Sequence, residues 1–337
     1  MKKETPISNI GYPLFKTVTN DNIKICFGQI QLTKSIFFVS ISTKRGDSMG
    51  QDKIFWDAIS YVYLAEEQAE RLHQHDSRIA PSLISFFYNL FPHPYFDLGL
   101  KSFKNKYILN ETEIEQTGNE TDDHSKIELQ GMASMYNYIE HFDFETDDLT
   151  IYELKELHKL LYSKAPHPEA AGNFRNHHVH LAETRKELTA PENINREFYS
   201  LGKEFDSTIN QSINHSDDLL NYIRNSVITT TKLMQIHPFH DGNGRSIRGL
   251  LNLMFKQANI PPVYVVPKEK EVYHKALDKA HIDIDYGAPD YSEIVDFYFY
   301  KICDSLIEIS KTNTDISIGN YDKHGVKIYQ KTKKDQK

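Results

Sequence analysis

Residues 236–248 read Ile-His-Pro-Phe-His-Asp-Gly-Asn-Gly-Arg-Ser-Ile-Arg. A helical pattern ends before this stretch. A second helical pattern begins inside it, with apolar residues spaced three or four apart between Ile247 and Phe255. The stretch is therefore a loop that runs directly into the N-terminus of a helix, and the functional interpretation of the chain starts from this junction.

The junction combines several features that bind anions. Gly242 and Gly244, on either side of Asn243, can adopt dihedral angles that turn backbone N–H groups towards one point. The N-terminus of the following helix adds unpaired donors and a partial positive charge. Arg245 and Arg248 are three residues apart and so lie on the same side of the first helical turns. Together these residues predict an anion site sized for a polyphosphate.

Two further side chains predict catalysis beside this site. Asp241 supplies a carboxylate, and Mg²⁺ in proteins typically uses one or two carboxylates together with substrate phosphates. His237 can act as a general base at neutral pH. Any one of these residues could belong to an ordinary helix cap, but the whole string favours a nucleotide site. The adjacent pair His240-Asp241 leaves open a metal-dependent phosphohydrolase, which would need further ligands and would give the glycines and arginines no role.

The string resembles the signature of the Fic (filamentation induced by cAMP) family, His-Pro-Phe-x-Asp/Glu-Gly-Asn-Gly-Arg-x-x-Arg, at every defined position. The upstream segments Leu154-x-x-Leu157-His158 and Gly172-Asn-Phe-Arg175 also resemble family segments, so the resemblance covers about residues 105–310. It implies a mainly α fold, with a Fic-type helical core that carries a small β-hairpin flap.

The resemblance also implies an activity, that of a protein adenylyltransferase, which transfers AMP from ATP to a hydroxyl side chain of a target protein; the same scaffold can also remove AMP. Two alternatives stay open: transfer of another nucleotide or phosphate-linked group by the same loop, and a nucleotide-binding regulatory module without transfer. The implied roles are the base for His237, the Mg²⁺ ligand for Asp241, the phosphate cradle for Gly242, Asn243 and Gly244, the β/γ-phosphate clamp for Arg245, and the adenine pocket for Tyr273.

A self-inhibitory helix is implied over residues 104–116. Many family members carry the motif Ser/Thr-x-x-x-Glu-Gly/Asn, whose Glu pairs with the second signature arginine and blocks the γ-phosphate. The matching stretch here runs from Glu111 to Gln116 and puts the inhibitory carboxylate at Glu115, opposite Arg248. The chain departs from the motif at both ends, because Glu111 replaces Ser/Thr and Gln116 replaces Gly/Asn. A solvated helix carboxylate is the alternative role for Glu115.

The segment from Gly172 to Leu188 contains alternating apolar residues and is predicted to form a short hairpin, the counterpart of the family's flap. The exposed edge of a hairpin can pair with an added strand, so we expect a target protein to bind along Val179–Leu181. His177, His178 and His180 alternate between the two faces of this hairpin, which favours a solvated flap over a metal site.

Outside this region the chain is predicted to have an N-terminal extension (1–103), the Fic domain (104–311) and a polar, Lys-rich tail (312–337). The extension is expected to contain a β-hairpin within 22–43, turning at Thr33-Lys34, and helices over 55–72 and 81–90. Residues 117–126 are expected to form a loop, followed by a helix from Lys126 to about residue 142. The extension could select the target or mediate a homodimer.

Composition excludes several classes of protein. The net charge of −8 argues against binding nucleic acid by bulk charge, although a nucleotide needs only a local positive site. Two cysteines cannot build a disulfide framework, so a reducing compartment is expected. No stretch approaches the ~20 apolar residues of a membrane span, and the N-terminus lacks the apolar core of a signal peptide. These features predict a cytoplasmic protein without a membrane partner, and leave export by another route open.

Overall fold

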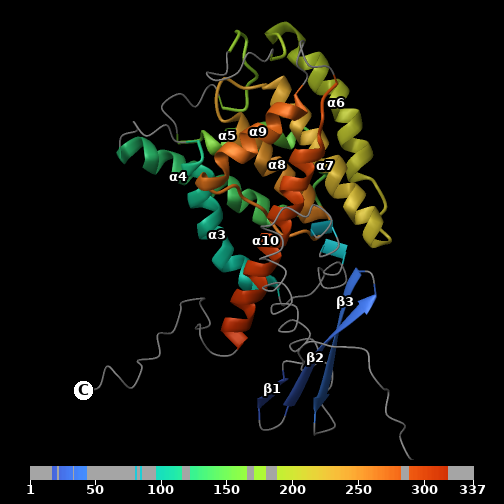
Figure 1. Cartoon of the computed structure of the whole chain (residues 1–337). Coiled ribbons are helices and arrows are strands. Elements are labelled where there is room, and N and C mark those ends of the chain that lie inside the picture. The colour runs from blue at the N-terminus through green and yellow to red at the C-terminus, as the bar shows by residue number, and fades with distance from the viewer. Residues whose placement is uncertain are drawn as a thin grey trace, which may run out of the picture. The chain divides into compact units, whose positions relative to one another are not determined.

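The computed structural model of the 337-residue chain describes residues 17–20, 23–32, 34–43, 80–81, 84–85, 96–115, 122–164, 171–179, 188–281 and 288–317. The chain divides into two compact units, Met1–Leu64 and Ala65–Lys337 (Figure 1).

The first unit contains a three-stranded antiparallel sheet in the order β1 (Thr17–Asn20), β2 (Ile23–Leu32) and β3 (Lys34–Thr43). β2 and β3 pair from end to end, with Ile23 opposite Thr43 and Leu32 opposite Lys34, so the predicted hairpin is confirmed. β1 was not predicted, because four residues are too few to show a period of two. The helices predicted over 55–72 and 81–90 lie outside the described residues, apart from helical pieces at 80–81 and 84–85.

All regular secondary structure in the described part of the second unit is helical, which confirms the mainly α class. Its helices are α3 (Phe96–Glu113), α4 (Asp122–His141), α5 (Glu153–Leu161), α6 (Ile194–Ile209), α7 (Ser216–Ile236), α8 (Asn243–Gln257), α9 (Lys270–Ala280) and α10 (Ser292–Ser317), with short 3₁₀ turns at Pro191–Asn193 and Pro267–Glu269. Residues 180–187, at the centre of the predicted flap, lie outside the described residues, so the flap hairpin stays a prediction.

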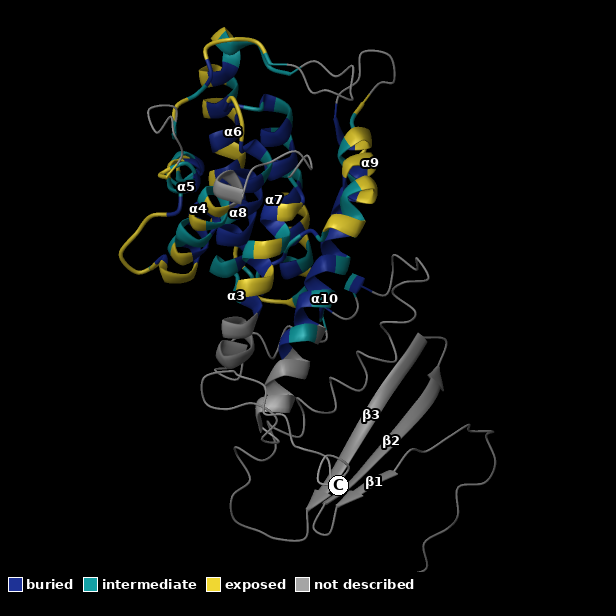
Figure 2. Cartoon of the chain, turned by 90° about the vertical axis from the view of Figure 1, so that its left-hand side faces the viewer, coloured by how far each residue is buried: buried dark blue, intermediate teal, exposed yellow. Residues whose placement is uncertain are grey.

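α8 is the central helix of this unit (Figure 2). It packs against α4, α5 and α7, and Asn243 and all residues from Arg245 to Phe255 are buried. The apolar face predicted between Ile247 and Phe255 lies in the core, as expected. The polar residues of the helix are buried too, because neighbouring helices cover that side as well. Consequently each of them needs a partner within the protein.

Two boundaries differ from the sequence prediction. α3 begins at Phe96 rather than near Lys104, and so the expected domain boundary at 103/104 falls inside a helix. α4 begins at Asp122 rather than Lys126. Acidic residue types are favoured in the first turn of a helix, and the sequence prediction gave this preference too little weight. Among the described residues, every helix is too short or too polar to cross a bilayer.

Helix α5 approaches α4 closely because residue 131 is a glycine. A Cβ atom added to Gly131 would lie 2.0 Å from the carbonyl oxygen of Leu161, at the end of α5. This contact sets the position of α5, which carries His158 and leads into Tyr162, and both of these residues reach the signature loop.

We predict that Gly131→Ala destabilises the protein by about 3 kcal/mol, because the methyl group meets backbone that cannot move without displacing α5. Denaturant unfolding followed by circular dichroism would measure the change. The matched control is Gly202→Ala on α6, whose new methyl would lie 3.3 Å from a side-chain methyl of Ile151; its effect should stay within about 1 kcal/mol. Equal effects of the two substitutions would contradict the packing argument.

Candidate active site

The signature loop begins at His237, directly after α7. His237 has left-handed backbone angles (φ 48°, ψ 61°), which are unfavourable for a residue with a side chain. Its N–H still donates to the carbonyl of Leu233, at 2.9 Å, and so closes the end of α7. The turn directs the chain away from the α7 axis and starts the loop that leads to α8.

Arg175 holds this turn in place. Its backbone N–H donates to the carbonyl of Pro238 at 2.8 Å. Its buried guanidinium donates to four more carbonyl oxygens, those of His237 (2.8 Å), His177 (2.9 Å), Thr189 (2.5 Å) and Ile236 (3.4 Å). A single side chain therefore joins the two ends of the predicted flap to the first residue of the loop.

Two side chains brace the middle of the loop. The amide of Asn243 bonds the backbone of Phe239 twice, accepting from its N–H and donating to its carbonyl, each at 2.9 Å. The ring of Phe239 stacks on His158 at 3.8 Å. His158 accepts from the N–H of Gly172 and donates to the carbonyl of Asp241, both at 2.9 Å. Asn243 was expected in the phosphate cradle. Its side-chain amide is used to hold the backbone of the loop, so it shapes the cradle through these two bonds.

Because two residues of the loop are glycines, other side chains can lie against the backbone at the N-terminus of α8. Gly242 has φ 70°, and a Cβ there would lie 2.5 Å from the ring of Tyr162. A Cβ on Gly244 would lie 2.5 Å from Oε1 of Glu115. The carboxylate of Glu115 thus lies directly on the glycine backbone at a helix N-terminus, which is where an anion binds best.

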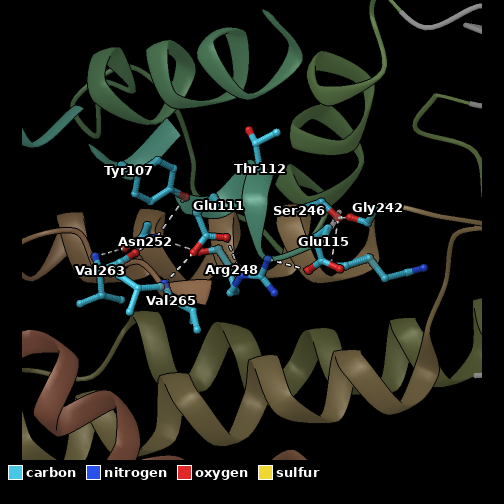
Figure 3. Close-up of polar contacts among 12 residues, drawn as sticks. Tyr107, Glu111, Thr112, Glu115, Gly242, Ser246, Arg248, Asn252, Val263 and Val265 are labelled. Carbon is cyan, nitrogen blue, oxygen red and sulfur yellow. Dashed lines mark hydrogen bonds and ion pairs between the residues drawn. The ribbon is translucent and has the colours of Figure 1, made fainter. Parts of the chain in front are cut away.

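The guanidinium of Arg248 is buried between two carboxylates of the α3 segment (Figure 3). Nε donates to Glu111 at 2.6 Å, and a terminal nitrogen donates to Glu115 at 2.7 Å. Burial alone would raise the pKa of Glu115, but the charge and hydrogen bond of Arg248 together with the charge of Arg245 outweigh it, and the pKa lies below its usual value. For the fully buried Glu111, burial outweighs Arg248 and raises the pKa.

Arg245 is paired as well. It donates to Glu128 on α4 at 2.6 Å, and its side chain is almost fully buried. A second nitrogen lies 3.3 Å from the hydroxyl of Tyr162 and 3.8 Å from Asp241. Both signature arginines therefore face carboxylates from the helices that precede the loop.

Asp241 keeps an exposed carboxylate that is fixed from two sides. Oδ1 accepts from the N–H of Gly242 at 2.7 Å, and Oδ2 accepts from the hydroxyl of Tyr162 at 2.6 Å. Burial opposes ionisation of Asp241, but the hydrogen bond from Tyr162 and the charge of Arg245 lower its pKa below the usual value. An ionised, oriented, accessible oxygen donor beside an anion cradle fits a Mg²⁺ ligand.

Tyr273 and the flap histidines were also singled out in the sequence. Tyr273 is buried, with the guanidinium of Arg248 5.7 Å from its ring centre, so it supports Arg248 from behind. A ring nitrogen of His177 lies 2.8 Å from one of His240, which brings the start of the predicted flap onto the signature loop. In the described part of the chain, no group of three metal-ligating side chains comes together. His180 and Leu181 lie outside the described residues.

Sequence reasoning missed four residues of this site. Glu111 was noted only as a departure from the motif, although its spacing of four from Glu115 places both on one helix face. Tyr162 follows His158 by the same spacing. Arg175 was quoted without a role. For Glu128, no local pattern distinguishes it from other surface carboxylates.

Comparisons with known proteins find relatives in sequence and in fold. A sequence model of the Fic/DOC family matches residues 148–255. The chain is 28% identical to the protein adenylyltransferase Fic of Nematostella vectensis over 159 residues, which is 47% of this chain and 35% of that protein. It is 29% identical to the protein of the same name from Drosophila melanogaster over 202 residues, which is 57% of this chain and 37% of that protein. The chain thus spans little more than a third of the length of these relatives.

Solved structures share the fold. Fic-1 from C. elegans matches with a TM-score of 0.53 and 19% identity, over 76% of this chain and 82% of that one. A Fic domain containing signaling protein from Bacteroides thetaiotaomicron matches with a TM-score of 0.55 and 16% identity, over 71% of this chain and 98% of that one. Residues 148–255 thus match the Fic/DOC family, and the chain shares the fold of solved Fic proteins.

We predict that the imidazole of His237 stays neutral from pH 8 to pH 5, because burial lowers its pKa from 6.5 to about 4. Histidine-labelled protein titrated by NMR would show this directly. The folded protein then binds fewer protons than the unfolded chain between pH 6.5 and 4, so the stabilisation from this group is present above pH 6.5 and is lost towards pH 4. A midpoint for His237 near 6.5 would contradict the prediction.

Proposed function

We propose that this protein is a protein adenylyltransferase that transfers AMP from ATP to a hydroxyl side chain of a target protein, and that Glu115 inhibits it. The observation that carries the proposal is the Glu115 carboxylate on the Gly244 backbone, paired with Arg248 at the α8 N-terminus. A negatively charged group already lies where the loop is shaped to receive one. The names of the relatives support the same activity.

The proposed reaction needs few groups. The target's hydroxyl oxygen attacks the α-phosphorus of ATP, and the bond from that phosphorus to the bridging oxygen breaks, releasing pyrophosphate. His237 takes the hydroxyl proton, a task for which a neutral imidazole is suited. Arg245 and the N-terminal N–H groups of α8 stabilise the charge that develops on the phosphates.

Asp241 would hold Mg²⁺ together with the phosphates of ATP. The metal would neutralise charge on the leaving pyrophosphate. Within the protein, the hydroxyl of Tyr162 and the carbonyl bond from His158 would keep this carboxylate oriented towards the cradle. Arg245, at 3.8 Å, would keep it ionised.

Glu115 would inhibit by competing with the terminal phosphate of ATP for Arg248. A guanidinium fork bonds a carboxylate and a phosphate with the same nitrogens. ATP would then bind only in a displaced pose, and a misplacement of about 1 Å can cost ~10²-fold in rate. The same carboxylate could orient a water on an AMP-modified target, which would account for removal of AMP by this site.

The first test is His237→Ala. We expect the transfer of labelled AMP to fall at least ~10²-fold, because the hydroxyl loses its base. Binding of ATP, measured by calorimetry, should change little because the imidazole does not belong to the phosphate cradle. Transfer at nearly the original rate would exclude His237 as the base. Parallel reactions with UTP, GTP and CDP-choline would reveal whether another phosphate-linked group is transferred instead.

The second test is Glu115→Gly, with Glu113→Gly as the matched control. Both changes remove one carboxylate near the end of α3, but Glu113 is exposed and lies outside the cradle. We expect self-modification with labelled ATP to rise at least about tenfold for Glu115→Gly and to stay at the basal level for the control. If both variants remain at that level while a transfer reaction that needs His237 is measurable, Glu115 does not inhibit.

A further inference from the structure

Arg248 has a second carboxylate partner, Glu111, that differs from Glu115 in its exposure, its place relative to α3 and its other contacts. Glu111 is fully buried, whereas the side chain of Glu115 is 34% exposed. Glu111 lies inside α3, whereas Glu115 follows the last helical residue, Glu113. In Figure 3 the two carboxylates lie on different sides of the guanidinium, with Glu115 towards Gly242 and Ser246 and Glu111 towards Val265.

Glu111 is also anchored to a second element. Oε1 accepts from the backbone N–H of Val265 at 3.0 Å, while Oε2 accepts from Nε of Arg248 at 2.6 Å. Next to it, the amide of Asn252 donates to the hydroxyl of Tyr107 and to the carbonyl of Val263, which fastens α3 and α8 to the same 263–265 segment.

Because of these contacts, moving Glu111 away from Arg248 takes more free energy than moving Glu115 away. Glu115 can leave the cradle if the turn after α3 opens, because its backbone N–H makes one weak bond, at 3.3 Å to Thr112. Withdrawing Glu111 requires α3 itself to separate from α8, α4 and α10, since the helix is packed against the latter two. Glu111 therefore stays beside Arg248 after Glu115 has gone.

We propose that Glu111 is a specificity-determining residue of this site: it keeps Arg248 electrically neutralised when Glu115 is withdrawn, and so weakens the binding of the terminal phosphate of a nucleoside triphosphate. When Glu115 leaves, the space above Gly244 is free and Arg248 regains N–H groups that can donate to a ligand. Its positive charge, however, is still cancelled by the carboxylate of Glu111. A carboxylate next to a phosphate-binding arginine opposes the incoming phosphate, because like charges repel strongly where water is scarce.

The inference rests on the proposed function only in that the cradle binds ATP. The experiment is a cycle of four proteins: the original chain, Glu115→Gly, Glu111→Gln and the double variant. Calorimetry with ATP and with AMP, in the presence of Mg²⁺, gives the dissociation constants. AMP lacks the terminal phosphates and so reports on the rest of the site. Glu113→Gln combined with Glu115→Gly is the control, since it removes the same charge from an exposed position on the same helix.

We expect Glu115→Gly to strengthen ATP binding, and Glu111→Gln in that background to strengthen it at least about fivefold further. AMP binding should change less than about twofold, and the Glu113→Gln control should match Glu115→Gly alone. If adding Glu111→Gln weakens ATP binding, or changes ATP and AMP binding equally, Glu111 is a structural support of Arg248 and the inference is wrong. If Glu115→Gly alone has no effect on ATP binding or self-modification, the proposed inhibition fails instead.

Glutamine offers one acceptor where Glu111 offers two, so either Arg248 or Val265 keeps an unpaired donor in Glu111→Gln. Thermal unfolding of each variant checks the fold. Should Glu111→Gln fail to fold, Glu111→Thr serves in its place, because threonine is a residue type of the family motif at this position. Stronger ATP binding with unchanged AMP binding would then support the inference, and no such strengthening would contradict it.

Discussion

The buried guanidinium of Arg248 constrains the rest of the helical unit. A positive charge removed from water is costly unless it is paired and hydrogen-bonded, and α8 is covered on all sides, so Arg248 cannot turn to solvent. Glu111 and Glu115 supply the pairing from the α3 segment, and Tyr273 covers the guanidinium from the α9 side. The need to pair one charge thus fixes how the end of α3 lies against α8. It also brings a carboxylate into the anion cradle.

The signature loop is held by contacts to its backbone. Arg175, His158 and Asn243 each bond two or more backbone groups in or beside the loop. Such bonds, which include those to the carbonyls of His237 and Asp241, define where the chain runs. The left-handed turn at His237 costs about 1 kcal/mol or more, and the carbonyl bonds of Arg175 offset that cost. The positions of the proposed catalytic groups are therefore set by residues that have no role in the proposed chemistry.

The charges of the site come from two parts of the chain. The segment that matches the Fic/DOC family, residues 148–255, supplies the cations Arg245 and Arg248. The carboxylates that contact them most closely, Glu111, Glu115 and Glu128, all precede that segment. The two guanidinium groups are thus both paired with carboxylates in this structure. In the proposed function ATP would compete with these carboxylates, and regulation would act through α3 and α4 without any change in the loop.

The sequence by itself determined the helical class and the loop-to-α8 junction, because these depend on local spacing. The identities of the cradle residues stay a prediction from residue types with few alternative uses. The sequence also indicated Glu115, through a motif only partly matched. Tertiary structure alone decided the roles of Glu111, Glu128 and Arg175. Their partners are 137, 117 and up to 62 residues away, and no local pattern encodes which distant group a carboxylate or guanidinium will meet. The start of α4 was missed for a related reason. The sequence of its first turn is polar, like that of a loop, and only the packing of the rest of the helix shows that these residues belong to it.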